Sequence, residues 1–280
     1  MKIRFWGVRG SFVAAGAEFT RYGGNTPCVE VTEGDNRLIL DLGSGAIPLG
    51  RALLADGAQG RRISILLSHT HIDHIMGFPF FAPVFHPKAS LTIYGPRGAG
   101  KRIESVLDDS LNPDYSPLFS IANLSAKLEF HELSEKSFRV EGFDITCAPM
   151  PHARTVSWAF RIRSGAGTVV YMTDVGYPGG SPGKSAVALA QDADIVIHDA
   201  TFSPEEYPQR EKWGHASWEH ALALAERAGA KKLVLFHHST DRTDDEVDRF
   251  VVLAREAGPK GLQVVGAMEG DGGEIEVRSE

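Results

Sequence analysis

The residues best suited to chemistry are a cluster of metal-binding side chains at positions 69–74, with the sequence HTHIDH. They directly follow the apolar run at 63–67, which is typical of a buried strand. Packing alone does not require three imidazoles and a carboxylate within six residues, whereas a site for two metal ions does. His69 and His71 can bind one ion, while Asp73 and His74 can bind a second ion beside it. The run therefore predicts a dinuclear metal centre.

Three further metal-binding side chains each follow a predicted strand. His152 comes after the strand expected near 143–150, Asp174 after 168–173 and His237 after 232–236. Strand ends beside turns are common places for functional side chains, and the arrangement occurs four times here, so we expect these residues to complete the site. His238 is an alternative to His237. Imidazole nitrogens combined with carboxylate oxygens suit Zn²⁺, Mn²⁺ or Fe.

The elements that must position these residues follow from apolar periodicity and turn chemistry. Strands are expected at 2–6, 28–32, 37–41, 63–67, 90–94, 127–132, 137–140, 143–150, 157–163, 168–173, 195–198, 232–236 and 263–266. Helices are expected at 48–55, 73–81, 98–107, 185–191, 218–228 and 244–257, and loops at 112–117 and 178–183. The order predicts an α+β fold in which two sheets pack together with helices outside. No linker divides the chain, so we expect one domain over 1–280.

Composition limits the classes of partner. The chain has 36 acidic and 29 basic residues, a formal charge of −7, which argues against binding long nucleic acid but permits a small phosphate-bearing substrate. Two cysteines form no disulfide framework, which favours a cytoplasmic location. No secretory leader is visible, and no apolar run approaches the roughly 20 residues of a membrane span, so we expect no membrane partner.

These motifs resemble the metallo-β-lactamase fold superfamily. Residues 69–74 match its His-x-His-x-Asp-His motif without a departure, and the later metal-binding residues follow in the family's order. The resemblance implies a four-layer αβ/βα sandwich and two divalent ions, most often zinc, with manganese or iron as alternatives. It assigns His69, His71 and His152 to the first ion. It also assigns Asp73, His74 and His237 to the second, with Asp174 bridging.

Three further segments resemble the RNase Z-like branch of this superfamily. Residues 233–239 are similar to its Leu-x-Leu-x-His-x-Ser strand end, which favours His237 over His238. Residues 197–202 resemble its His-Glu-Ala-Thr-Phe box, with Asp199 in place of glutamate, and 214–217 resemble its Gly-His-Ser-Thr box. The resemblance implies that His215 contacts the scissile phosphate or protonates the leaving oxygen, and that Asp199 orients it. His215 could instead cap the helix that begins near Ser217.

Other segments carry weaker implications. Residues 40–45 resemble the first motif of the superfamily, in which Asp41 would fix a ligand histidine. Residues 5–11 and 22–28 are similar to a bacterial group of metal-dependent hydrolases related to cyclic-nucleotide phosphodiesterases. Arg154, two residues after a predicted ligand, and Arg242 could each bind a phosphate oxygen. Surface arginines are common, so a purely structural role is as well supported for both.

The leading interpretation is a dinuclear metal phosphodiesterase, with Asp73 orienting or deprotonating water and a small phosphodiester such as a cyclic nucleotide as substrate. A tRNA 3′-processing endoribonuclease is one alternative, but no Gly-rich, basic insertion lies between His152 and Asp174, where its tRNA-gripping arm is expected. A lactone or thioester hydrolase is a second alternative, and a non-enzymatic metal-binding protein a third. The aromatic stretch at 78–85 suits either a homodimer contact or core packing.

Overall fold

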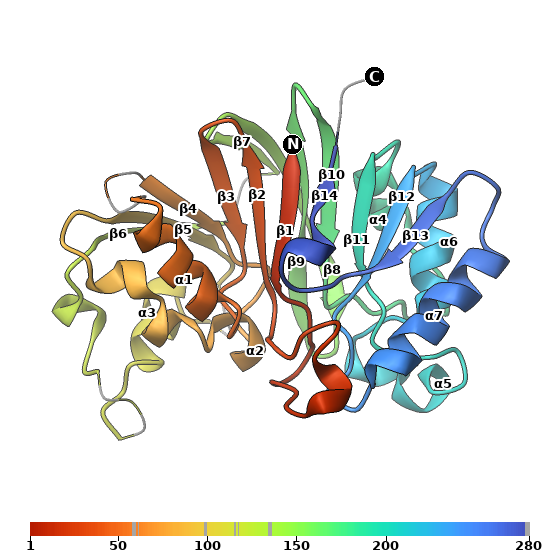
Figure 1. Ribbon diagram of the computed structural model, residues 1–280, viewed down its shortest axis with the longest axis horizontal. Helices are drawn as coiled ribbons and strands as arrows, with labels where there is room; N and C mark the ends of the chain where they lie inside the picture. The colour runs from red at the N-terminus through yellow and green to blue at the C-terminus, as the bar shows by residue number, and fades with distance from the viewer. Residues whose placement is uncertain are drawn as a thin grey trace.

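The computed structural model describes residues 1–57, 60, 62–97, 100–114, 116, 118–133 and 136–277, and in it two seven-stranded sheets pack against each other (Figure 1). The first sheet consists, in spatial order, of β14 (Ile275–Glu276), β1 (Lys2–Gly7), β2 (Cys28–Glu33), β3 (Asn36–Leu40), β4 (Arg62–Leu66), β5 (Ser90–Gly95) and β6 (Lys127–Glu132). The second sheet consists of β13 (Gln263–Gly266), β12 (Lys232–Phe236), β11 (Ile195–Asp199), β10 (Gly167–Met172), β9 (Thr155–Ser164), β8 (Phe143–His152) and β7 (Ser137–Val140).

Helices cover the outer faces of both sheets (Figure 1). The helices on these faces are α1 (Ala46–Ala55), α3 (Ile103–Asp109), α4 (Lys184–Ala190), α6 (Trp218–Ala228) and α7 (Asp244–Ala257). Two short helices, α2 (Ile72–Ile75) and α5 (Tyr207–Arg210), lie at the lower edge of the molecule in this view. One apolar core lies between the sheets, where Phe5 meets Phe236. A second core joins the first sheet to α1 and α3, and a third joins the second sheet to α4, α6 and α7. The α+β, four-layer αβ/βα sandwich is therefore confirmed.

Strand direction brings the predicted site residues to one edge of the molecule. In the first sheet β3 pairs with β4 in parallel, so the residues after both strands lie together. In the second sheet β10, β11 and β12 are parallel neighbours. Strand β8 is antiparallel to β9, which is antiparallel to β10, so β8 and β10 end at the same side. With the exception of β9, each of these strands ends at, or within a few residues of, a predicted site residue.

Most predicted elements are confirmed, several of them with identical bounds, such as α6, α7 and β12. Ser217 caps α6, and Gly229 ends it in a left-handed conformation. Two short elements, α5 and β14, were not predicted. Four and two residues respectively are too few to produce a periodic pattern.

The helix predicted near 73–81 is wrong in length. Helix α2 spans only Ile72–Ile75, and a separate 3₁₀ turn follows at Phe78–Phe80. Gly77 leaves the helix because its N–H donates to the Leu42 carbonyl at 2.9 Å and its Cα packs against Gly43. The helix predicted at 98–107 begins later, at Ile103, and residues 98 and 99 of that prediction lie outside the described part of the chain.

Candidate metal centre

Three of the predicted site residues have an unusual backbone conformation. Asp41, Asp174 and His237 follow the ends of β3, β10 and β12 and have φ angles of 63°, 54° and 61°. This left-handed region is unfavourable for residues other than glycine, and such strain concentrates at functional sites. In each case the left-handed residue breaks the extended strand and redirects the chain at the shared edge of the sandwich.

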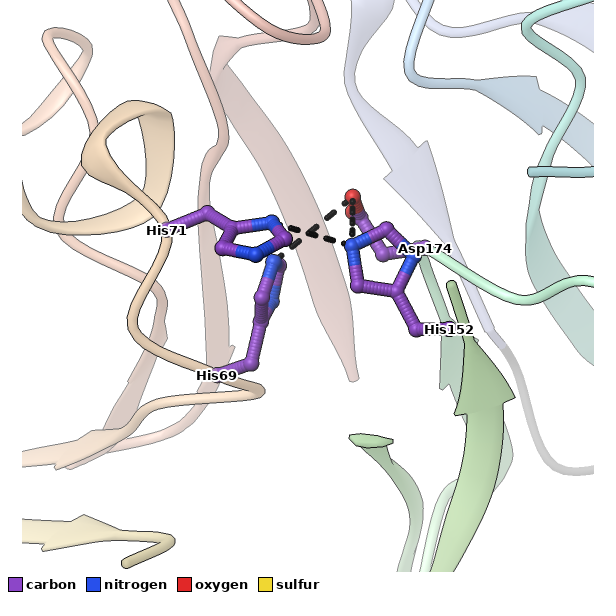
Figure 2. Close-up of side chains that lie close together, drawn as sticks. All are labelled: His69, His71, His152 and Asp174. Atoms are coloured by element: carbon purple, nitrogen blue, oxygen red, sulfur yellow. Dashed lines mark hydrogen bonds and ion pairs between the residues drawn. The ribbon is translucent and has the colours of Figure 1, made fainter. Parts of the chain in front are cut away.

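The first group of side chains consists of His69, His71, His152 and Asp174 (Figure 2). Each can offer one ligand atom, and these atoms lie within 4.8 Å of one another. Nε2 of His152 lies 3.0 Å from Nδ1 of His71. His71 is exposed while the other three are buried, so the group lies at a protein surface that solvent or substrate can reach.

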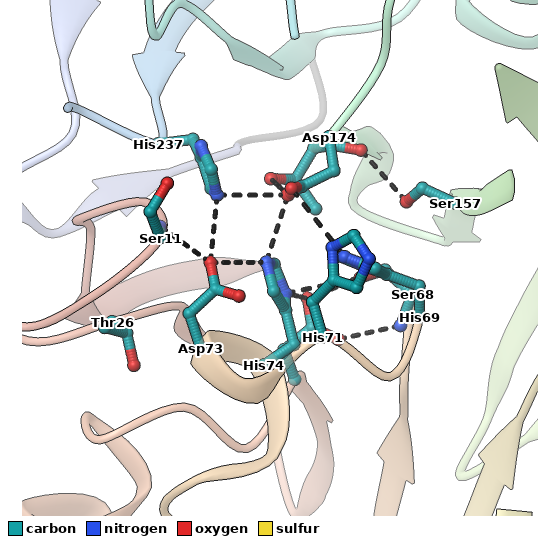
Figure 3. Close-up of polar contacts among 12 residues, drawn as sticks. Ser11, Thr26, Ser68, His69, His71, Asp73, His74, Ser157, Asp174 and His237 are labelled. Carbon is teal, nitrogen blue, oxygen red and sulfur yellow. Dashed lines mark hydrogen bonds and ion pairs between the residues drawn. The ribbon is translucent and has the colours of Figure 1, made fainter. Parts of the chain in front are cut away.

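The second group consists of Asp73, His74, Asp174 and His237, all buried (Figure 3). One carboxylate oxygen of Asp73 lies 3.3 Å from Nε2 of His74 and also 3.3 Å from Nε2 of His237. The backbone N–H of Ser11 donates to the same oxygen at 2.8 Å. The N-terminal loop therefore contributes directly to the position of Asp73.

Asp174 belongs to both groups, and its two oxygens face different histidines. Oδ1 lies 3.7 Å from Nε2 of His69 and 3.6 Å from Nε2 of His152. Oδ2 lies 3.0 Å from Nε2 of His74 and 3.2 Å from Nε2 of His237. A carboxylate that presents one oxygen to each set could bridge two ions, which is the role that the family resemblance implies for this residue.

In each buried histidine of the two groups, Nδ1 contacts a partner outside the cluster. This contact directs Nε2 toward the cluster. Nδ1 of His74 lies 2.8 Å from Asp41, and Nδ1 of His152 lies 2.7 Å from the Gly214 carbonyl. Hydrogen bonds of this kind fix the tautomer and orientation of metal-binding imidazoles. The remaining Nδ1 contacts are His69 with Ser68 at 3.1 Å and His237 with Thr201 at 3.0 Å.

Asp41 is itself anchored by several donors. Its carboxylate accepts the backbone N–H of Ser68 at 2.7 Å, the Ser68 hydroxyl at 2.9 Å and the Tyr171 hydroxyl at 2.7 Å. Together with the contact to His74, this buried carboxylate matches the supporting role predicted for it.

The donor set fits metal ions. Nε2 of His69 and of His74 is buried and has no hydrogen-bond partner among the described residues, although the Asp174 carboxylate lies within 3.7 and 3.0 Å. Buried polar atoms are rarely left without partners, so these nitrogens need a ligand. Burial lowers the pKa of His69, His71 and His152, which favours the neutral imidazole that binds metals. At His74 the charges of the surrounding carboxylates outweigh burial and raise the pKa.

His215 and Asp199 form a third group that shares Asp174 and His237 with the others. Nδ1 of His215 lies 2.8 Å from Oδ2 of Asp199, so the shorter aspartate still reaches the histidine. Burial opposes charge on His215, but Asp199 outweighs it and raises the pKa of His215 to about 9. The alternative role of His215 as a helix cap is wrong, because Ser217 and His220 form the capping box of α6.

The two predicted phosphate-binding arginines differ. Arg154 is exposed, in the two-residue turn between β8 and β9, beside His152. The guanidinium of Arg242 lies 2.5 Å from Glu206 and packs over the Phe250 ring at 4.4 Å. These contacts use Arg242 within the protein and favour a structural role. His238, the alternative to His237, points elsewhere: its Nε2 lies 3.0 Å from the Ala267 carbonyl.

Several residues that support the site were not assigned that role from the sequence. Gly10 packs so closely on His237 that an added Cβ would lie 2.2 Å from the imidazole. Arg9 is fully buried, where it donates to the Gly23 carbonyl at 2.7 Å and to Asp244 at 3.0 Å. The segment at 5–11 resembles a family motif, but the sequence does not indicate that the fold places it beside Asp73 and His237.

Comparison with known proteins agrees with this fold and site. Residues 42–238 match the family model of the β-lactamase superfamily domain, so the chain belongs to that superfamily. A ribonuclease Z from Bradyrhizobium sp. (strain ORS 278) is 26% identical, over 84% of this chain and 91% of that protein.

Two solved structures share the fold. The metallo-β-lactamase fold protein YhfI from Bacillus subtilis is 24% identical, with a TM-score of 0.72 and 96% of each chain covered. A diphosphatase from the PhnP family is 19% identical, with a TM-score of 0.68 over 100% of this chain and 99% of that one.

The chain is therefore a metal-dependent hydrolase of the metallo-β-lactamase superfamily, and its relatives support the RNase Z-like branch. The His and Asp groups fit divalent metal ions. Among the helices in the described residues, none has both the length and the apolar character needed to cross a bilayer.

Proposed function

We propose that this hydrolase cleaves small phosphodiesters, such as cyclic nucleotides, at a dinuclear centre formed by His69, His71, Asp73, His74, His152, Asp174 and His237. The observation that carries the proposal is the contact of His215 with Asp199 beside the metal-binding groups. An alkoxide leaving group, such as that of an alkyl phosphodiester, must receive a proton. The pair of His215 and Asp199 offers an oriented imidazole that can supply it.

Each group has a distinct role in this proposal. Two divalent ions would lower the pKa of a water molecule and neutralise the phosphate oxygens. Asp73, held by the Ser11 N–H, orients or deprotonates that water. Asp199 accepts the Nδ1 proton of His215, which leaves Nε2 of His215 to donate a proton to the leaving oxygen. Zinc is the favoured metal, with manganese or iron as alternatives, because histidine with aspartate accommodates all three.

A tRNA 3′-processing endoribonuclease is the second candidate, and the relatives named ribonuclease Z favour it. Against it, β9 and β10 form a hairpin whose turn is only Gly165 and Ala166, so the segment from His152 to Asp174 contains no extended arm. The net charge of −7 also disfavours a large RNA footprint. Both features favour a small substrate.

Two further predictions accompany the proposal. We expect residues 1–280 to act as one domain, since residues of both sheets form the core between them. A homodimer also stays a prediction. Phe80 and Phe85 of the aromatic stretch are exposed, which suits a protein contact, whereas Phe78 and Phe81 are buried in the core.

The test compares substrates and metal states. The protein is stripped with a chelator, reloaded with Zn²⁺, Mn²⁺ or Fe²⁺, and assayed with bis-p-nitrophenyl phosphate, p-nitrophenyl acetate, a lactone and an unprocessed tRNA. We expect metal-dependent turnover of the diester at least ~100-fold above that of the ester and lactone. Loaded protein that leaves the diester intact would exclude the proposal. Efficient cleavage of the tRNA at its 3′ side, with little diester turnover, would favour the second candidate.

A further inference from the structure

We infer that the cavity beside His152 and His215 receives the leaving group of the substrate, and that Arg154 and Lys212 bind a second phosphoryl group on that leaving group. The inference rests on the proposed phosphodiesterase function and specifies its substrate class: diesters whose leaving side carries a further phosphate. The sequence alone indicates no role for Lys212 and does not indicate which phosphate Arg154 would bind.

The cavity has a volume of about 510 Å³, within the range that holds a nucleotide-sized group. Three loops line it, at 151–154, 176–178 and 211–214. Each loop contains or adjoins a residue of the candidate site: His152 in the first, Asp174 two residues before the second and His215 directly after the third. The metal-binding side chains and His215 do not themselves line the cavity, but the segments that carry or adjoin His152, Asp174 and His215 form its walls.

The three loops hold one another in place. The Gly176 N–H donates to the Pro151 carbonyl at 2.7 Å, and Nδ1 of His152 lies 2.7 Å from the Gly214 carbonyl. An added Cβ on Gly176 would lie 3.0 Å from Cα of Gly214, so the second and third loops are in close contact. The cavity walls are therefore preformed, which lowers the entropic cost of binding a ligand.

Two cationic side chains border this cavity. Arg154 and Lys212 are both exposed, and neither forms an ion pair within the described part of the chain. The third charged residue of the lining, Glu211, accepts the Gly179 N–H at 3.1 Å. The other lining residues are glycine, alanine and proline. Two cationic groups against one carboxylate leave the wall with a net positive charge, which favours an anion. Arginine can bind two phosphate oxygens at once.

Local backbone geometry fixes Arg154 near the reaction. Only Ala153 and Arg154 connect β8 to β9, because His152 already pairs with Thr155 across the hairpin. Ala153 has a left-handed φ of 46°, so the turn is tight. The leaving oxygen must approach Nε2 of His215, and Gly214, the residue before it, lines the cavity. The group attached to that oxygen then extends toward Arg154 and Lys212.

Inhibition of bis-p-nitrophenyl phosphate hydrolysis tests the inference in the metal-loaded protein. Adenosine 3′,5′-bisphosphate should inhibit at least ~10-fold more tightly than adenosine 3′-monophosphate, because its second phosphate reaches the two cations. Arg154→Gln and Lys212→Gln should each lower this preference at least ~3-fold. Arg163→Gln is the matched control: Arg163 is also exposed but lies at the far end of β9, paired with Asp144, and its substitution should leave the preference unchanged.

Equal inhibition by the two nucleotides, or an unchanged preference in both cavity variants, would overturn the inference while diester hydrolysis still supports the proposed function. If the loaded protein does not hydrolyse bis-p-nitrophenyl phosphate at all, the proposed function itself fails. A third outcome would also overturn the inference. If the cavity variants slow cleavage of a precursor tRNA but keep the preference for the bisphosphate over the monophosphate, the two cations bind phosphates of an RNA.

Discussion

At the scale of single residues, Asp174 is the centre of the candidate site. Its two carboxylate oxygens face two different sets of histidines, and its backbone adopts a left-handed φ of 54°. Such a conformation costs about 1 kcal/mol or more for a residue with a Cβ. The protein tolerates this cost because a relaxed backbone would direct the carboxylate away from one of the two sets.

The pair of His215 and Asp199 should control the cleavage of substrates with poor leaving groups. We expect His215→Ala and Asp199→Asn to lower kcat at least ~100-fold on an alkyl diester, and much less on bis-p-nitrophenyl phosphate, whose leaving group needs no proton. Metal content should stay the same. The control is His131→Ala, an exposed histidine on β6. Equal losses on both substrates, or none on the alkyl diester, would remove His215 from the role of proton donor.

Asp41 should control metal affinity without contacting an ion. Its contact with Nδ1 of His74 orients that ring and keeps its tautomer fixed. We expect Asp41→Asn to weaken metal binding ~10- to 100-fold, as for other carboxylates that support a ligand histidine. Competition with a chromogenic chelator measures this change. Circular dichroism of the metal-loaded variant shows whether the fold is retained, and unchanged affinity in a folded variant would contradict the role.

At the scale of elements, parallel strands that end side by side bring distant residues together. Strands β10, β11 and β12 deliver Asp174, Asp199 and His237 to one edge, and β4 delivers the cluster at 69–74 from the other sheet. The N-terminal loop completes the arrangement, because Ser11 binds Asp73 and Gly10 packs on His237. This loop is held by buried Arg9, which joins it to the start of α7 through Asp244.

Gly10 offers a direct test of that loop. A Cβ at this position would lie 2.2 Å from the His237 imidazole, so Gly10→Ala must displace either the loop or the ring. We expect the variant to lose the ion that the group with His237 would bind, which is about half of the bound metal. We also expect it to lose diester turnover. Gly183→Ala is the control, since a Cβ there meets nothing within 4 Å. Full metal content in Gly10→Ala would mean that the loop moves and the His237 ring stays in place, and would contradict this prediction.

The elements also explain what the sequence could and could not predict. Long periodic segments such as α6 and α7 were predicted with their observed bounds, and residues such as His152 were identified because each follows a strand. The length of the helix near 73–81 was predicted wrongly, because the Gly77 N–H donates to the carbonyl of Leu42, which is far away in the sequence. Thr201 and Gly214 hold His237 and His152 through contacts that depend on the tertiary fold. No local pattern marks such partners.

At the scale of the whole molecule, the metal-binding residues come from both sheets. His69, His71, Asp73 and His74 follow β4 of the first sheet, whereas His152, Asp174 and His237 belong to the ends of strands in the second. Bound ions would therefore link the two halves of the sandwich in addition to the apolar core between them. Metal binding and global stability should be coupled.

Removal of metal should lower the thermal stability of the protein. Ions present at ~100 times their dissociation constant add about 2.7 kcal/mol to the free energy of unfolding per site. We expect the melting temperature to fall in excess chelator and to recover when Zn²⁺ or Mn²⁺ is restored. In a doubly substituted His69→Ala, His74→Ala variant the chelator should have little effect. A wild-type melting temperature that does not respond to chelator would argue against ions joining the two sheets.

Alkaline pH should destabilise the protein through its buried thiols. Burial raises the pKa of Cys147 to about 11 and also raises that of Cys28. Below pH ~9 the thiols are protonated in both states; between ~9 and 11 the unfolded chain ionises first, so the free energy of unfolding falls as pH rises. Cys147→Ala should therefore lose less stability than wild type between pH 8 and 10.5, measured by urea unfolding. Parallel pH profiles would contradict this prediction.

The division of ligands between the two sheets also sets an order of events when the chain folds. His69 and His237 are far apart along the polypeptide, and neither half holds a complete set of ligands for either proposed ion. Metal capture must then wait until the sheets have docked, so a nascent chain that has formed only β1 to β6 of the first sheet cannot hold the ion pair. Two fragments divided between β6 and β7 should each be inactive alone and should recover metal binding only when they reassemble.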